Sequence, residues 1–325
     1  GDFQATNPSG ATGGALPGGI AWYRKHFDVP SYDRNKHYFI DFDGVYMNAS
    51  VYLNGHLLGT RPYGFISYRY ELTPYLKAKD NVMAVRVDNS EQPNCRWYSG
   101  SGIYRHVYLV TTNALHVAHW GTFVRATTDG KVCAEIKIDN QGSRSETVTV
   151  RNTVLNSAQK VVSTVLRKLT VNPNKPAIFE ENMQVDKPEL WSIESPYRYV
   201  LRTEIVQGGR VLDRYDTPFG FRSFHFDAQT GFWLNGKNLK INGVCNHHDL
   251  GCLGAAVHRD AIYRQLRLLK DMGCNAIRCS HNPPAPELLE LCDSMGFIVM
   301  DESFDMWHRK KTKYDYSRYF DQWFE

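Results

Sequence analysis

The sequence predicts a mostly β protein of several domains whose last third changes to alternating strands and helices. Two observations predict this fold class. Short runs of strand-forming residues, separated by turn signals, fill the chain up to about residue 221. Beyond it, apolar strand-like runs alternate with segments whose apolar residues recur at helical spacing. The length of 325 residues fits two or three domains of about 100–200 residues each.

Residues 1–112 are predicted to form a first β domain, a sandwich or jelly roll. Within it, Asn54-Gly55 is a strong signal for a two-residue hairpin turn. No segment of this region has a convincing helical period. Short strands with frequent turns are typical of sandwiches and jelly rolls. Strands are predicted at 22–29, 37–42, 49–53, 82–87 and 103–110.

Residues 113–221 are predicted to form a second β domain with fewer aromatic residues. Gly208-Gly209 is expected to be a hairpin turn between two of its strands. About seven short strands in roughly 100 residues are typical of an immunoglobulin-like sandwich. Strands are predicted at 132–138, 146–150, 161–165, 177–179 and 199–206.

Residues 222–325 change to the order strand, helix, strand, helix, strand. Gly273 is placed as the glycine that ends the first helix, and Pro286 as the residue that opens the second. The strands are apolar on both faces, which indicates a parallel sheet with crossover helices. After a hairpin at Asn235-Gly236, strands are predicted at 239–244, 275–279 and 297–300, and helices at 260–272 and 286–296.

Composition excludes several classes of partner. A net charge of +4 is too small to predict nucleic-acid binding. No apolar run approaches the roughly 20 residues of a membrane span, so we expect no membrane partner. The seven cysteines are an odd number, and buried free thiols are favoured over disulfides. Aromatic residues reach 13%, which suits packing between sheets and also stacking on apolar ring faces.

Polar side chains follow each of the three predicted parallel strands. They are the segments 246–249 (Asn-His-His-Asp), 280–282 (Ser-His-Asn) and 301–302 (Asp-Glu). The carboxyl ends of neighbouring parallel strands meet on one face, so we expect these groups to form a site. Histidine, asparagine and carboxylate groups suit a polar, hydroxyl-rich ligand. A metal is the first rival, but the spacing of the histidines does not support one, and no metal ligand is assigned.

Several motifs are similar to those of a known family. They are 51–56 (VYLNGH), 96–105 (RWYSGSGIYR), 242–249 (NGVCNHHD), 275–283 (NAIRCSHNP) and 300–302 (MDE). Together they resemble glycoside hydrolase family 2, in particular its β-galactosidase-like members. The resemblance implies a jelly-roll sugar-binding domain, an immunoglobulin-like β-sandwich and the first part of a (β/α)8 barrel. It also implies retaining hydrolysis of a β-glycosidic bond by two carboxyl groups.

The resemblance implies substrate-binding roles for five residues. His247 and His281 match histidines that line the subsite of the sugar being cleaved, and Asn282 borders it. Asn89 matches a first-domain position that reaches across to the same sugar, although a turn-capping role is an equal alternative. Glu302 matches a supporting polar residue and is not assigned as a catalyst. Trp97 and Tyr98 can stack on a sugar, with core packing as the alternative.

No catalytic residue is assigned within the chain. In the family, the acid/base is a glutamate in an Asn-Glu pair after the fourth barrel strand, and the nucleophile comes later, so both are expected beyond Glu325. A barrel of this type needs about 250 residues, so we expect residues 222–325 to be an incomplete barrel and this fragment to be inactive. No cofactor is assigned. Residues 303–308 depart from the magnesium site of some β-galactosidases, so the chain supports neither a divalent cation nor sodium.

The parent enzyme is therefore expected to cleave terminal β-galactosides, with a β-linked saccharide as its partner. A β-glucuronidase, a β-mannosidase or another β-glycosidase of the same family is the alternative within this class. A non-catalytic carbohydrate-binding protein is the alternative of another class. A homo-oligomer is left open, and the compartment is unknown, with a soluble protein of the bacterial periplasm or cytoplasm as the expectation.

Overall fold

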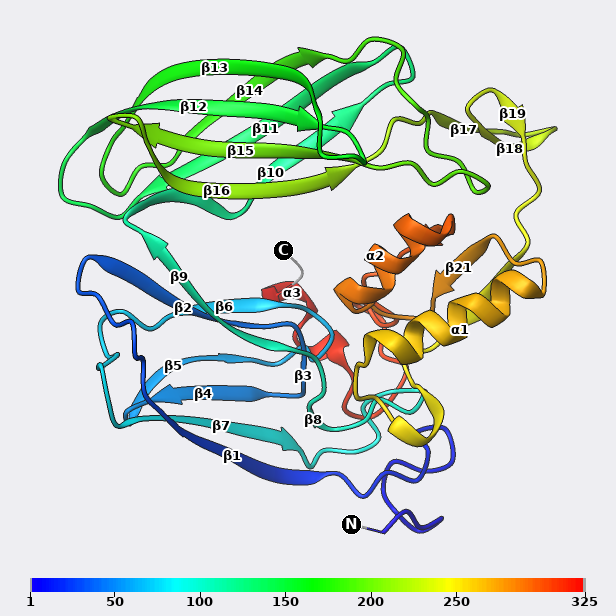
Figure 1. Ribbon diagram of the computed structural model, residues 1–325. Coiled ribbons are helices and arrows are strands. Elements are labelled where there is room, and N and C mark those ends of the chain that lie inside the picture. Colours follow the sequence, from blue (N-terminus) through cyan, green and yellow to red (C-terminus); the bar gives the residue numbers. More distant parts are fainter. Residues whose placement is uncertain (1, 324–325) are drawn as a thin grey trace.

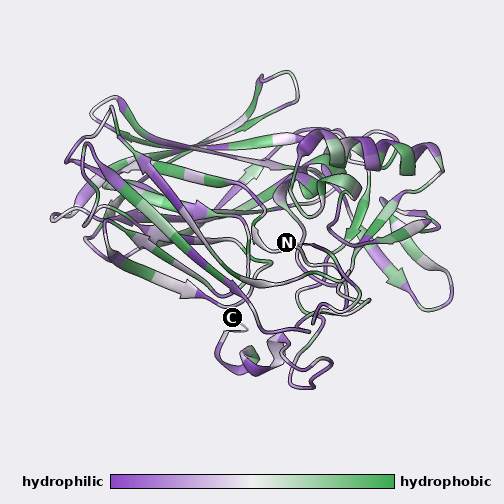
Figure 2. Ribbon diagram, turned by 90° about the horizontal axis from the view of Figure 1, so that it is seen from below, coloured by the Kyte–Doolittle hydropathy of each residue, from purple (hydrophilic) through white to green (hydrophobic). Residues whose placement is uncertain are grey.

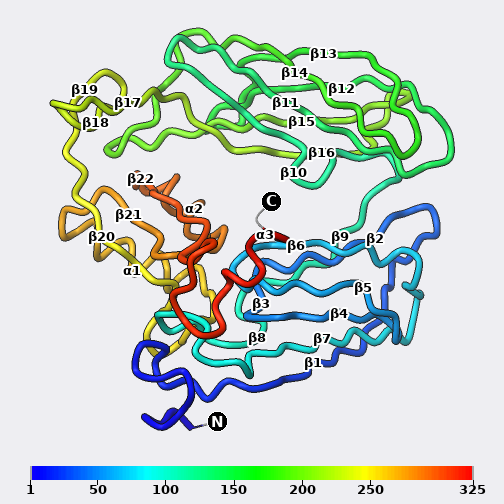
Figure 3. Tube along the Cα trace, turned by 180° about the vertical axis from the view of Figure 1, so that it is seen from behind, coloured from blue at the N-terminus to red at the C-terminus, as the bar shows by residue number. Residues whose placement is uncertain are grey.

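The computed structural model, which describes residues 2–323, contains two β-sandwiches and one α/β segment. The sandwiches lie one above the other, and the α/β segment packs beside both of them (Figure 1). The view from behind shows the same arrangement, with the carboxyl-terminal tail against the first sandwich (Figure 3). The structure confirms the predicted mostly β fold class.

The first sandwich pairs a four-stranded sheet, β1-β7-β4-β5, with a three-stranded sheet, β6-β2-β9. Along β7 every second residue is buried, as expected of a strand with one face on the core. Asn54 and Gly55 have positive φ values of 51° and 87° and form the predicted turn between β4 and β5. The strands are β1 (Gly19–Phe27), β2 (Lys36–Phe42), β3 (Val45–Tyr46), β4 (Ala49–Leu53), β5 (His56–Arg61), β6 (Tyr68–Glu71), β7 (Asn81–Asn89), β8 (Gly102–Ile103) and β9 (Val107–Asn113).

The single strand predicted at 103–110 is wrong, because the chain breaks between β8 and β9 around Arg105. The Arg105 side chain is buried. Its Nη1 donates to the backbone carbonyl oxygens of Asp43, at 3.2 Å, and Phe65, at 3.0 Å. Its Nη2 donates to the carbonyl oxygen of Pro283, at 2.7 Å, in the α/β segment. The hydrogen-bonding needs of a buried guanidinium therefore override the strand propensity of its neighbours.

The second sandwich has the seven strands typical of an immunoglobulin-like fold, in sheets β10-β11-β14 and β13-β12-β15-β16. Gly208 and Gly209 form the predicted turn between β15 and β16. Green hydrophobic and purple hydrophilic residues alternate along many strands (Figure 2). The strands are β10 (Leu115–Ala126), β11 (Lys131–Asn140), β12 (Glu146–Leu155), β13 (Val161–Val171), β14 (Ala177–Gln184), β15 (Tyr199–Gln207) and β16 (Arg210–Phe219).

The α/β segment contains the predicted parallel sheet, in the order β20-β21-β22. Helix α1 buries Ile262 and Leu266 against it, and Gly296 ends α2 at a φ of 74°. A small hairpin sheet, β17-β18-β19, precedes it. The elements are β17 (Phe224–Asp227), β18 (Gly231–Leu234), β19 (Lys237–Asn238), β20 (Gly243–Asn246), η1 (Gly251–Leu253), α1 (Arg259–Asp271), β21 (Ala276–Cys279), α2 (Pro286–Met295) and β22 (Ile298–Met300).

The strand predicted at 239–244 lies later in the chain, at β20. The preceding residues form a connection held by the side chain of Asn275. Its Oδ1 accepts from the backbone N–H of Asn242, at 2.8 Å, and its Nδ2 donates to the carbonyl oxygen of Lys240, at 2.9 Å. These side-chain contacts replace the backbone ladder that a strand would need.

The tail after β22 packs on the first sandwich through aromatic and charged residues. It contains η2 (Tyr316–Arg318) and α3 (Phe320–Trp323). Tyr63 donates from its hydroxyl to the carbonyl oxygen of Ser303, at 2.8 Å, and Arg96 forms an ion pair with Asp305. A cluster of aromatic residues therefore joins the first sandwich to the tail.

The structure bears out the prediction of free thiols. All seven cysteines are free, although Cys245 and Cys252 are exposed and not buried as expected. Within residues 2–323, no helix is long and apolar enough to cross a membrane.

Candidate functional site

The carboxyl ends of the three parallel strands bring His247, His281 and Glu302 together. His247 follows β20, His281 lies two residues beyond β21, and Glu302 lies two residues beyond β22. The imidazole rings of the two histidines are 5.6 Å apart, centre to centre, at 75°. His281 Nδ1 is 2.8 Å from Glu302 Oε2. Parallel register places the three strand ends at one edge of the sheet, as the sequence predicts.

Trp97 of the first sandwich forms a wall of this group. Its ring is 5.5 Å from that of His247 at 19°, a stacked arrangement, and 5.5 Å from that of His281 at 68°, edge to face. The residue is only 6% exposed, and it also packs on Phe65. Trp97 thus serves the core and contacts both histidines, so one aromatic residue joins the first sandwich to the strand ends.

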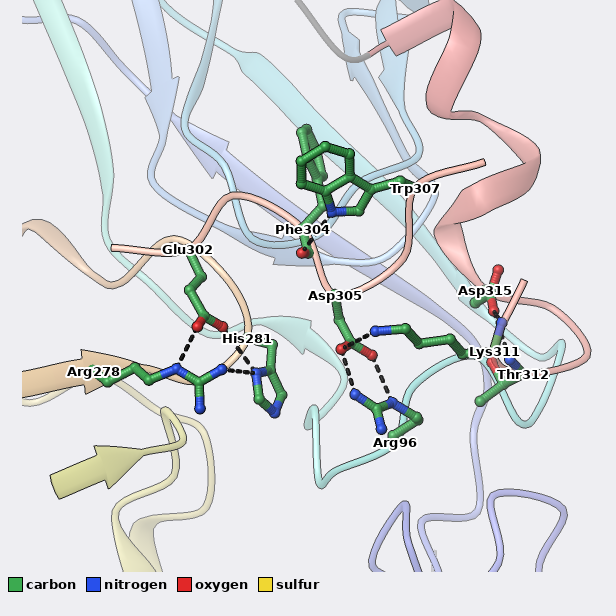
Figure 4. A network of polar contacts seen from close by, with 10 residues as sticks. All are labelled: Arg96, Arg278, His281, Glu302, Phe304, Asp305, Trp307, Lys311, Thr312 and Asp315. Atoms are coloured by element: carbon green, nitrogen blue, oxygen red, sulfur yellow. Dashed lines mark hydrogen bonds and ion pairs between the residues drawn. The ribbon is translucent and has the colours of Figure 1, made fainter. Parts of the chain in front are cut away.

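Arg278, which the sequence reasoning did not single out, holds Glu302 from β21. Its Nε donates to Glu302 Oε1, and its Nη2 lies 3.4 Å from His281 Nδ1 (Figure 4). Partial burial acts to raise the pKa of Glu302, but hydrogen bonds from His281 and Arg278 keep that pKa below its ordinary value. Glu302 is therefore an ionised anchor for His281. The signal in the sequence was an arginine within 275–283, three residues before the histidine.

The structure does not bring the Asn89 side chain to this group. Asn89 is fully buried, and its Oδ1 accepts from Gln92 Nε2 and Asn94 Nδ2, each at 2.8 Å. Its Nδ2 donates to the carbonyl oxygen of Gly100, at 3.4 Å. These contacts hold the loop that carries Trp97, which is the local structural role left open as the alternative.

Asn282 is buried beside the strand ends. It is 3% exposed, and its Nδ2 donates to the carbonyl oxygen of Pro283, at 2.9 Å. Its Oδ1 has no hydrogen-bond partner among residues 2–323. Asn282 borders the group of His247 and His281, and its free acceptor lies among residues that line a small cavity.

His248 contacts the first sandwich while its neighbour His247 stands in the candidate site. Its Nε2 is 2.9 Å from the carbonyl oxygen of Ser99, and its ring packs on Phe65 and Tyr104. Burial lowers the pKa of His248 to about 4, against a partly compensating hydrogen bond to Ser99. The ring is therefore neutral, and Nε2 carries the proton that is donated to the carbonyl.

We expect His248 to make stability depend on pH. Its pKa is about 4 when folded and 6.5 when free, so the unfolded chain binds more protons between these values. The contribution of neutral His248 to stability is then present above pH 6.5. It is lost as the pH decreases, by about 2 kcal/mol between pH 6.5 and 5. Urea unfolding at several pH values measures this slope. His248→Gln should flatten it, and an unchanged slope in that variant would contradict the assignment.

The described residues, 2–323, contain no group of three or more histidine, cysteine or acidic side chains placed to hold a metal ion. Asp305, in the segment compared with a magnesium site, is occupied by Arg96 and by Lys311, whose Nζ is 2.9 Å from Oδ1 (Figure 4). Its carboxylate therefore joins the tail to the first sandwich.

Comparison with family models gives three consecutive matches, all to one family. Residues 20–128 match the galactose-binding domain-like model of glycosyl hydrolase 2, and residues 116–222 match the model named glycosyl hydrolases family 2. Residues 228–318 match the TIM barrel domain of the same family.

Similar proteins include two with glycosidase names, each from a different bacterium. A β-galactosidase of Bacteroides ovatus is 54% identical over 330 residues, covering 100% of this chain and 39% of that protein. A β-glucuronidase of Formosa agariphila is 30% identical, covering 87% of this chain and 32% of that protein. The chain thus spans about two fifths or less of the length of these relatives.

Similar solved structures agree over nearly the whole chain. A glycosyl hydrolase family 2 member from Bacteroides cellulosilyticus superposes with a TM-score of 0.95 at 38% identity, covering 99% of this chain and 42% of that one. A β-glycosidase from Bacteroides vulgatus gives a TM-score of 0.90 at 42% identity, covering 99% and 41%.

Proposed function

Because the chain belongs to glycosyl hydrolases family 2, we propose that it is the sugar-binding part, the sandwich and part of the barrel of a retaining β-galactosidase. The observation that best supports a glycosidase site is the packing of His247 and His281 against Trp97 at the strand ends. The 54% identity to a β-galactosidase favours galactosides. We divide the chain into domains at 1–112, 113–221 and 222–325.

In this proposal the two histidines hold the hydroxyl groups of the sugar that is cleaved. The Nδ1–H of His281 donates to Glu302, which leaves Nε2 for a sugar hydroxyl. His247 is exposed and supplies a second polar contact beside it. Such hydrogen bonds strengthen as positive charge develops on the sugar ring, and this lowers the barrier. Asn282 borders the subsite, and Asn89 supports it through the loop of Trp97.

The two carboxyl groups of the retaining mechanism are proposed to come from barrel segments outside these 325 residues. Glu302 is already paired with Arg278 and His281. An ionised carboxylate paired in this way is a poor proton donor, because protonation would break both interactions. The proposed role of the chain is to bind and orient the glycone. Similarity to a β-glucuronidase supports that activity as the second candidate.

Activity on nitrophenyl glycosides tests this proposal. We expect the protein made from its complete reading frame to hydrolyse the β-galactoside at least tenfold faster than the β-glucuronide. Residues 1–325 expressed alone should hydrolyse neither, because they provide no catalytic carboxyl pair. A preference for the glucuronide would support the second candidate. Hydrolysis by purified residues 1–325 would contradict the proposal that the two catalytic carboxyl groups lie outside these residues.

A further inference from the structure

A small cavity lies between the first sandwich and the α/β segment, next to the residues that carry the candidate site. Its volume is about 40 Å³. Apolar side chains from the helices, including Ile262 and Leu288, line one side of it. The volume is far too small for a monosaccharide, and His247 and Asn282 of the proposed sugar subsite also line the cavity, so it adjoins that subsite.

Five side chains that line this cavity have a buried polar atom without a hydrogen-bond partner in the described part of the chain. These atoms are Arg105 Nε, Asn246 Nδ2, His248 Nδ1, Ser280 Oγ and Asn282 Oδ1. A buried polar atom without a partner costs about 1–3 kcal/mol, so five in one place would be severely destabilising. Their concentration around a single cavity indicates a shared ligand.

The hydrogen-bonding character of the five atoms identifies the ligand. Arg105 Nε and Asn246 Nδ2 can only donate, and the Ser280 hydroxyl can donate or accept. His248 Nδ1 can only accept, because the proton of the neutral ring is on Nε2, which donates to Ser99. Asn282 Oδ1 also only accepts, because Nδ2 of the same amide donates to Pro283.

The presence of both donors and acceptors among the five atoms excludes ions as occupants of the cavity. An anion would face the lone pairs of His248 and Asn282, and a cation would face the guanidinium of Arg105. Water both donates and accepts, and it satisfies all five atoms. A volume of about 40 Å³ has room for about one to three water molecules.

We propose that this cavity is a binding site for internal water, which links Arg105 of the first sandwich to the segments 246–248 and 280–282. Arg105 already donates to the carbonyl oxygen of Pro283, so the water extends an existing bridge between the two parts. The segments that it links are those that carry His247 and His281. The water therefore helps to fix the position of both strand ends, whatever sugar they bind.

A crystal structure of the protein, with crystals soaked in rubidium bromide, tests the identity of the occupant. We expect one to three water peaks, each within hydrogen-bond distance of at least two of the five atoms, and no anomalous signal in the cavity. An anomalous peak from bromide or rubidium there would overturn the proposal. A cavity without electron density would overturn it too.

Asn246→Leu provides a second test, because its effect on the thermal unfolding midpoint should differ between a cavity filled with water and a dry one. If water fills the cavity, leucine displaces it and leaves other polar atoms unpaired, so we expect the thermal unfolding midpoint to fall by about 2–4 °C. If the cavity is dry, leucine removes an unpaired polar group, and the midpoint should stay or rise. Asn182→Leu, at an exposed position of β14, is the matched control and should change it little.

Discussion

His281→Ala is expected to lower kcat/KM on the preferred glycoside by about 100–1,000-fold in the protein made from its complete reading frame. The variant removes the imidazole that we propose contacts the sugar, and it leaves Glu302 with Arg278 as its remaining partner. Removing one positioned hydrogen-bond donor from a transition-state site has effects of this size. Steady-state kinetics measure it, with circular dichroism to confirm folding.

His37→Ala is the matched control for that loss. His37 lies on β2 and pairs with Glu71 on the first sandwich, away from the strand ends of the α/β segment. Its removal should leave kcat/KM within about twofold, because the partly exposed pair of His37 and Glu71 contributes little to stability. If His281→Ala retained full activity, the proposed subsite would be wrong, even if the protein proved to be a glycosidase.

Trp97→Ala is expected to lower kcat/KM by about 10–100-fold and to destabilise the protein by about 3–5 kcal/mol. The indole packs on both His247 and His281, so its loss frees two imidazoles at once and opens a cavity at the boundary between the first sandwich and the barrel segment. Kinetics and urea unfolding measure the two effects.

Trp97→Phe separates the two effects. An aromatic ring at this position keeps the stacking on His247, so we expect most of the activity to return while part of the stability loss remains. Equal loss of activity in Trp97→Phe and Trp97→Ala, with Trp97→Phe folded, would show that stacking does not position the histidines.

The elements of the fold were largely predictable because their causes are local. Runs of strand-forming residues between turn signals indicated the strands of both sandwiches, and Asn54-Gly55 and Gly208-Gly209 indicated two hairpins. The helices followed from apolar spacing with Gly273 and Gly296 beyond their ends. Predictions failed where a side chain acts on a distant backbone, as Arg105 does between β8 and β9 and Asn275 does before β20.

The candidate site was predictable only in part. Three polar strand ends were enough to place His247, His281 and Glu302 on one edge, because parallel register fixes where strand ends meet. The anchoring of Glu302 by Arg278 was not predicted, because Arg278 lies on a strand whose sequence indicates an apolar core element. The local role of Asn89 was left open by the sequence, since a buried amide and a ligand contact use the same residue type.

The sequence by itself determined the three β and α/β regions, their order and the residues at the strand ends, because hydropathy period and turn chemistry are properties of neighbouring residues. Only the tertiary structure decided that Trp97 covers both histidines, that Arg105 reaches a carbonyl 178 residues further along the chain, and that five polar atoms surround one cavity. These contacts join residues far apart in the chain. Their geometry depends on how the first sandwich packs against the parallel sheet, and no local pattern records that packing.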